Sequence, residues 1–109
     1  MKGTKMEELK MILRQFRDER DWAQYHNPEN LAKSVSIEAG ELLECFQWGD
    51  DYDRHAVSDE LADVLCYVIM LADTIGIDLK EETLRKISEN AVKYPVEKSR
   101  SRSDKYTVL

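Results

Sequence analysis

The sequence predicts an all-α protein, an antiparallel four-helix bundle. Only four glycines and two prolines interrupt the 109 residues, and apolar residues recur at helical spacing through four segments. No segment reads convincingly as a strand. Because amphipathic helices bury their apolar faces against one another, the expected architecture is a bundle.

Start and stop signals bound the four helices. Asn27 and Asp78 are the expected N-caps of the second and fourth helices, and Pro28 suits a first helical position. Gly76 is expected to end the third helix, and Pro95 the fourth. The predicted helices cover about 5–21, 28–48, 55–75 and 79–94.

Charge is unevenly distributed along the chain. The net charge is −6, yet residues 91–109 hold five basic and two acidic residues, a net charge of +3. We expect a helical domain over 1–94 and a basic tail over 95–109 that belongs to the same domain. The tail is either a solubilising end or a flap that supplies positive charge to a phosphate ligand. The acidic balance argues against nucleic acid as a partner.

Two isolated cysteines, Cys45 and Cys66, lie within apolar runs. They predict reduced core residues of a cytoplasmic protein, not a disulfide framework or a zinc site. The N-terminal MKGTKMEELKMILRQF carries charges throughout, so we expect neither a signal peptide nor a membrane span.

The third predicted helix contains VLCYVIMLA, residues 64–72, which is apolar nearly all the way round. A chain of this size cannot easily bury such a helix completely. This pattern favours a homodimer with the third helix at the interface. The alternative is that it is the central helix of a monomer.

Two of the predicted helices each carry an acidic pair at the edge of an apolar stripe. At about 100° per residue, Glu38 lies on the edge of its stripe and Glu41 one step further round, whereas Glu44 points toward solvent. Glu60 and Asp63 take the matching positions on the third helix. Packing the two stripes together would bring four carboxylates to one site.

Four ionised carboxylates in a partly buried site repel one another, so the cluster needs a cation. All-oxygen ligation suits Mg²⁺, with Mn²⁺ as a substitute. Gly40, inside the helix, costs about 1 kcal/mol relative to alanine, and would let another element approach closely. The alternative is a solvated acidic face. A di-iron site is disfavoured, because His26 and His55 do not complete an E-x-x-H motif.

The stretch EAGELLECFQW, followed by DELADVLCYVI, resembles the MazG-like, all-α nucleoside triphosphate pyrophosphohydrolases. Their signature is E-x-x-E followed by E-x-x-D. Here these motifs are Glu38-x-x-Glu41 and Glu60-x-x-Asp63, with 18 residues between them.

Two further stretches resemble the subgroup of this family that is related to dCTP pyrophosphatase. RDWAQYHNPENLA, residues 20–32, is similar to the N-terminal motif of that subgroup. KYPVEKSR, residues 93–100, with KYT at 105–107, is similar to its C-terminal segment. Ser101 departs from the pattern, because relatives commonly carry glycine there.

The resemblance implies Mg²⁺-dependent hydrolysis of an NTP or dNTP to the monophosphate and pyrophosphate. The expected substrate is dCTP or a modified or non-canonical pyrimidine nucleotide. Cations would neutralise and orient the triphosphate and activate the water that attacks phosphorus. Either Glu38 or Glu41 would take the proton from that water. The implied metal ligands are Glu38, Glu41, Glu60 and Asp63. The resemblance also implies assembly as a dimer or a dimer of dimers.

Other residues match family positions associated with the substrate. Lys93 and Lys98, with Tyr94 beside them, are candidates to hold phosphate oxygens. Trp48 lies seven residues after Glu41 and Tyr67 four residues after Asp63, so we expect each on the same helical face as an acid, where an aromatic ring can stack on a base. Ordinary packing is the alternative. The residues that match the nucleotide pocket are Trp22, His26, Trp48 and Tyr67.

Two alternatives to this function stay open. One is a dUTPase or phosphoribosyl-ATP pyrophosphohydrolase-like activity, with the same metal chemistry and another base pocket. The other is a helical interaction module without activity, whose acids form a solvated face.

Overall fold

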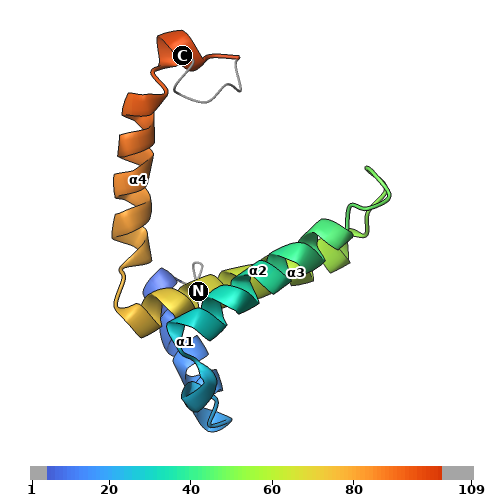
Figure 1. The fold of residues 1–109 in the computed structure, drawn as a ribbon, viewed down its shortest axis with the longest axis vertical. Helices are drawn as coiled ribbons and strands as arrows, with labels where there is room; N and C mark the ends of the chain where they lie inside the picture. The colour runs from blue at the N-terminus through green and yellow to red at the C-terminus, as the bar shows by residue number, and fades with distance from the viewer. Residues whose placement is uncertain (1–4, 102–109) are drawn as a thin grey trace. The chain divides into compact units, whose positions relative to one another are not determined.

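The computed structural model describes residues 5–101, and all the regular elements in this range are helical (Figure 1). The all-α fold class predicted from the sequence is therefore confirmed. The match to KYT at 105–107 lies outside the described residues. The elements are α1 (Met6–Glu19), a 3₁₀ turn η1 (Ala23–Tyr25), α2 (Pro28–Glu44), α3 (Arg54–Ile75), α4 (Leu79–Lys93) and α5 (Val96–Ser99).

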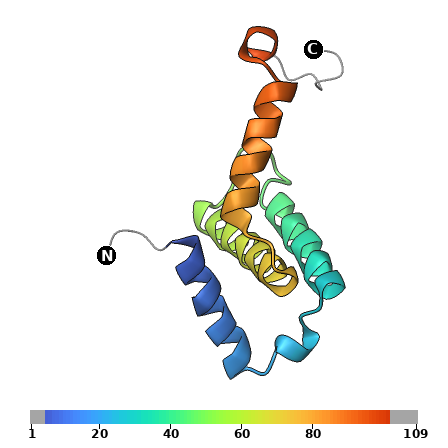
Figure 2. The same cartoon turned by 90° about the vertical axis from the view of Figure 1, so that its left-hand side faces the viewer.

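The chain divides into two compact units, one ending at Ile77 and the other beginning at Asp78. In the first unit, α2 and α3 lie side by side and run antiparallel, and α1 contacts α3 (Figures 1 and 2). The second unit contains α4 and α5. The predicted division at residue 94 into domain and tail stays a prediction.

Most helix ends follow the predicted signals. The Asn27 side chain accepts a hydrogen bond from the Asn30 N–H at 2.8 Å, and Asp78 accepts one from the Glu81 N–H at 3.0 Å. Both therefore cap their helices as expected. Gly76 ends α3 in the left-handed region, at a φ of 74°, which glycine adopts without steric cost.

The predicted end of the second helix is wrong. α2 ends at Glu44, and the N–H groups of Cys45 and Phe46 instead reach back three residues to carbonyl oxygens at 3.1 and 3.0 Å. This tighter turn ends the regular α-helical spacing before Trp48. The position of Trp48 relative to Glu41 therefore does not follow from that spacing, and its side chain is 82% exposed.

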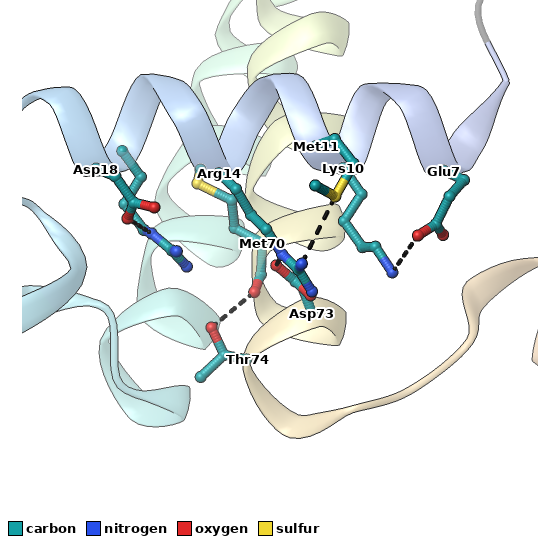
Figure 3. A network of polar contacts seen from close by, with 9 residues as sticks. Glu7, Lys10, Met11, Arg14, Asp18, Met70, Asp73 and Thr74 are labelled. Atoms are coloured by element: carbon teal, nitrogen blue, oxygen red, sulfur yellow. Dashed lines mark hydrogen bonds and ion pairs between the residues drawn. The ribbon is translucent and has the colours of Figure 1, made fainter.

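Within residues 5–101, the buried apolar residues lie on α2 and α3. They are Leu31, Ile69 and Ala72. An ion pair adds α1 to this small core: the Arg14 Nε donates to Asp73 Oδ2 at 2.7 Å, and a second nitrogen of Arg14 contacts the other oxygen (Figure 3). The Asp73 side chain is only 9% exposed, and its hydrogen bonds with Arg14 lower its pKa.

Large apolar side chains remain exposed on the first unit. Leu43 on α2 is 72% exposed, and Leu61 and Leu65 on α3 are 53% and 43% exposed. The third predicted helix is thus incompletely buried within one chain, as its apolar sequence suggested. None of the described helices is both long and apolar enough to cross a membrane.

The role predicted for Gly40 needs correction. A Cβ placed on Gly40 would meet nothing within 4 Å in the chain as described. Among residues 5–101, no other element makes the close approach that this glycine was expected to permit.

Candidate metal centre

The packing of α2 on α3 brings acidic side chains from both helices together. Glu38 lies in the middle of α2, and Glu60 and Asp63 lie in the first half of α3. One carboxylate oxygen from each of the three lies within 4.8 Å of the others. The matching edge positions predicted from the helical angles therefore do meet in the structure.

The raised pKa values of the clustered acids show that their charged forms are unfavourable here. Burial, followed by hydrogen bonding and repulsion with Glu41, raises the pKa of Glu38 to about 7. The pKa of Glu60 is also raised, first by burial and then by the charge of Glu41. Glu41 is exposed and is not among the three acids whose oxygens lie within 4.8 Å of one another, but its charge raises the pKa of both Glu38 and Glu60, so the fourth predicted acid lies beside the cluster.

Two carboxylate oxygens at the centre of this cluster lack hydrogen-bond partners. Glu38 Oε2 and Glu60 Oε2 are both buried, and neither finds a partner among residues 5–101. A buried, unpaired carboxylate oxygen is costly unless it is protonated or coordinates a cation. Several hard oxygen atoms within 4.8 Å are the donor set that Mg²⁺ prefers, so the residues fit the expected metal.

Tyr67 lies beside the acids, as its spacing from Asp63 predicted. Its pKa is raised first by burial and then by the charges of Glu38 and Asp63. The phenol therefore stays protonated and can donate a hydrogen bond next to the carboxylate cluster.

An open recess of about 460 Å³ extends from the acids along the end of α2. Glu41 and Glu60 line it together with Glu44, Cys45 and Gln47. Glu44 is exposed as predicted, but it borders this recess rather than pointing away from it. Sequence reasoning missed Cys45 and Gln47 because they follow the end of α2, where helical spacing no longer predicts direction.

Trp22 and His26 flank η1 in the connection between α1 and α2. Trp22 is 44% exposed and contacts Phe16. The Nδ1 atom of His26 is buried without a hydrogen-bond partner in the described part of the chain. Burial and the nearby positive charge of Arg17 lower the pKa of His26, so its imidazole is held neutral.

The predicted phosphate-binding residues belong to the second unit. The Lys93 Nζ lies 3.5 Å from Glu89 Oε1 at the end of α4, Tyr94 caps this helix, and Lys98 lies in α5. Ser101 adopts a φ of 65°. The backbone there is left-handed, the conformation that favours the glycine of relatives.

Paired acids on two packed helices are the arrangement expected from the sequence resemblance, and a comparison with protein families tests that resemblance. Residues 33–109 match the MazG-like family, and the chain belongs to that family.

Curated relatives and a solved structure support the same assignment. The chain is 38% identical to mouse dCTP pyrophosphatase 1 and 39% identical to the human protein of that name, over 114 residues in each case. Each alignment covers 95% of this chain and 67% of the relative. A crystal structure of a pyrophosphatase from Archaeoglobus fulgidus matches with a TM-score of 0.78 and 45% identity, over 87% of this chain and 96% of that one.

Proposed function

We propose that this chain is a Mg²⁺-dependent nucleoside triphosphate pyrophosphohydrolase that converts a (d)NTP to the monophosphate and pyrophosphate. Membership of the MazG-like family supports the class, a hydrolase of nucleotide anhydride bonds. The relatives named dCTP pyrophosphatase 1 favour dCTP, or a modified or non-canonical pyrimidine nucleotide, as the substrate.

The observation that carries the proposal is the pair of unpartnered oxygens of Glu38 and Glu60 inside the acidic cluster. We assign Glu38, Glu41, Glu60 and Asp63 as the residues that hold the cation. A bound Mg²⁺ would supply charge neutralisation, orientation of the phosphates and activation of the attacking water. Either Glu38 or Glu41 would take the proton from that water, because Glu38 belongs to the cluster, Glu41 lies beside it and a carboxylate can act as a general base.

The nucleoside is assigned to the aromatic and imidazole side chains. Trp22 and Trp48 are exposed and offer ring faces for base stacking. Tyr67 offers a hydroxyl next to the acids, and neutral His26 offers an unpartnered nitrogen. Lys93 and Lys98, with Tyr94, are assigned to the phosphates, because ammonium groups offset the repulsion between an acidic chain and its substrate.

The active form is proposed to be a homodimer or homotetramer. The exposed Leu61 and Leu65 follow one face of α3 at a spacing of four residues, next to the acids of the same helix. An apolar stripe in this position would lower the free energy of association when a second copy covers it.

Pyrophosphate release from a panel of canonical and modified nucleotides tests the proposed function. At least one nucleotide should yield pyrophosphate with Mg²⁺. Glu41→Gln and Asp63→Asn should lower release at least about 100-fold, since even supporting residues of a metal site cost 10–100-fold. Circular dichroism should show that both variants remain helical.

Matched substitutions on the same helices provide controls. Glu29→Gln on α2 and Asp59→Asn on α3 alter exposed acids whose partners are Lys33 and His55. Both should retain release within about twofold, because exposed ion pairs contribute little. Full release in both Glu41→Gln and Asp63→Asn would refute the ligand assignment, and no release by the wild type from any nucleotide would refute the function.

A further inference from the structure

The end of α1 is built so that the backbone of Trp22 turns back toward the helix. Asp21 has a φ of 54°, in the left-handed region. The Trp22 N–H donates to the Arg17 carbonyl at 3.0 Å, and the Asp21 N–H donates to the Asp18 carbonyl at 3.1 Å. This pair of hydrogen bonds around one left-handed residue is a Schellman motif. It fixes the direction in which Trp22 leaves the helix.

Side-chain contacts then hold the indole. Trp22 meets Phe16 in a T-shaped arrangement, with ring centroids 5.8 Å apart and planes 71° apart. An apolar contact of this kind, between the residue after the turn and the last full turn of the helix, often accompanies a Schellman motif. Edge-to-face geometry is a favoured arrangement for aromatic pairs.

Arg20 also packs against Phe16. Its Nη1 atom donates to the Phe16 carbonyl oxygen at 2.9 Å, and its Cζ atom lies 3.6 Å from the centroid of the Phe16 ring. The same Cζ lies 6.0 Å from the Trp22 ring. The guanidinium is therefore fixed to both the backbone and the ring of Phe16, and it borders Trp22.

This stack contributes little to the core. No residue of α1 is buried, and Phe16 and Trp22 are each 44% exposed. A held yet open aromatic ring suits ligand binding better than packing, because a preorganised ring loses less conformational freedom when a ligand stacks on it.

We propose that Phe16 and Arg20 are positioning residues that hold Trp22 as the stacking platform for the nucleobase, with the left-handed turn at Asp21 setting its direction. This inference rests on the proposed function, because it assigns the residues that prepare the base site of the same enzyme. Stacking on an indole is tolerant of base identity. The arrangement therefore serves affinity for the base, whereas other contacts select it.

The mobility of Trp22 without substrate gives the first test. The chain has two tryptophans, so a Trp48→Phe background leaves Trp22 as the sole emitter. In this background, Phe16→Leu and Arg20→Met should each raise the amplitude of nanosecond motion in fluorescence anisotropy decays about twofold, because each removes a contact that holds the ring. Phe16→Tyr keeps the ring and should restore the wild-type decay. Arg85→Met, an arginine of the second unit, is the matched control and should leave it unchanged.

The backbone turn is tested separately. Asp21→Gly should preserve the anisotropy decay, because glycine adopts a positive φ freely. Asp21→Val should raise the mobility of Trp22, because a β-branched residue strongly disfavours this conformation. Equal decays in these two variants would overturn the role assigned to the turn.

Binding and kinetics connect the platform to the nucleotide. Quenching of Trp22 by dCMP, which needs no hydrolysis, should give a dissociation constant about three- to tenfold higher in Phe16→Leu and Arg20→Met. With Trp48 intact, the same substitutions should raise KM by a similar factor and change kcat less than twofold. A merely structural role would instead lower the active fraction and leave KM and the dissociation constant unchanged.

The outcomes separate the inference from the function on which it rests. Pyrophosphate release with unchanged Trp22 mobility and dCMP affinity in both variants overturns the inference and leaves the hydrolase intact. An unchanged KM in Trp22→Ala overturns the inference together with the base site. Altered dCMP affinity in the variants, with no pyrophosphate release from any nucleotide in the wild type, supports the platform and refutes the hydrolase.

Discussion

At the scale of single residues, Glu38 combines burial, repulsion and an unpartnered oxygen. These features make the acids a source of instability in the cation-free chain. The cost disappears when a proton or a cation neutralises the cluster. The same features that destabilise the cation-free chain thus favour cation binding.

The repulsion among these acids predicts that the stability of the chain in EDTA depends on pH. The pKa of Glu38 rises from 4.5 to about 7 on folding, so between these values the folded chain holds more protons than the unfolded chain. Stability must therefore fall as pH rises through this range. Glu38→Gln should flatten the decline in urea unfolding measurements between pH 5 and 7, whereas Glu29→Gln should not. Parallel declines in Glu38→Gln and the wild type would contradict the assignment.

A cation should reverse this effect. In the wild type at pH 7.5, millimolar Mg²⁺ should raise the Tm, because a ligand that binds only the folded state stabilises it. The shift should vanish in Asp63→Asn and persist in Asp59→Asn, measured by differential scanning calorimetry. An equal Mg²⁺ shift in Asp63→Asn would place the cation elsewhere.

Helical spacing in the sequence predicted which acids lie close together, but it was less reliable for the positions of the neighbouring aromatic residues. Glu38, Glu60, Asp63 and Tyr67 lie on regular helices, so a fixed angle per residue sufficed to group them. Trp48 lies beyond the end of α2, and no glycine or proline between residues 41 and 48 marks that end. Regular helical spacing therefore does not apply to Trp48, and its place beside Glu41 stays a prediction.

At the scale of the elements, the Arg14–Asp73 pair joins α1 to α3 (Figure 3). Arg14→Met should destabilise the chain by about 1–3 kcal/mol, because it leaves a largely buried carboxylate without its partner. The double variant Arg14→Met/Asp73→Leu should recover part of this loss. Urea unfolding of the four chains in this cycle measures the coupling. Strictly additive effects would show that the pair does not hold α1.

The Arg14–Asp73 pair should make stability rise with pH, the opposite of the dependence expected from Glu38. Arg14 lowers the folded pKa of Asp73 below its ordinary 3.8, so its stabilisation is present above that value. The contribution is lost as pH falls through the folded pKa. Stability of the wild type should therefore drop below pH 4 more steeply than that of Asp73→Leu, as acid unfolding monitored by circular dichroism can show. Equal acid sensitivity in the two chains would argue against the pair.

Helix boundaries could be predicted from the sequence where capping residues mark them. Asn27 and Asp78 accept backbone hydrogen bonds, and Gly76 adopts the conformation that ends a helix. α5 was missed because its four residues, Val96–Ser99, are too short to display helical periodicity.

At the scale of the whole molecule, the exposed apolar side chains of α3 and the open space beside Gly40 support the proposed assembly of several copies. Leu61 and Leu65 should lie in an interface between copies, so Leu61→Glu and Leu65→Glu should shift the sedimentation coefficient toward that of a monomer. The expected weakening is at least about tenfold, since a buried unpaired charge costs several kcal/mol. Ser58→Glu, on an exposed part of the same helix, is the control. A wild-type monomer at micromolar concentration would contradict the assembly.

The apolar surface of α3 shows the limit of reasoning from helical periodicity. The apolar run predicted that one chain would not bury this helix completely, but not which side chains stay exposed. The sequence also gave no sign that Gly40 has open space beside it within the chain. Both depend on how helices pack, which periodicity along one helix does not encode.

The most direct test of the account is pyrophosphate release from dCTP as a function of Mg²⁺ concentration. The wild type should release none in EDTA and should saturate with Mg²⁺, whereas Glu60→Gln should fall at least about 100-fold at every concentration. Asp59→Asn, one residue away, should follow the wild-type curve. Release in EDTA, or a wild-type curve for Glu60→Gln, would contradict the claim that the acids of α2 and α3 form the metal site of a nucleotide hydrolase.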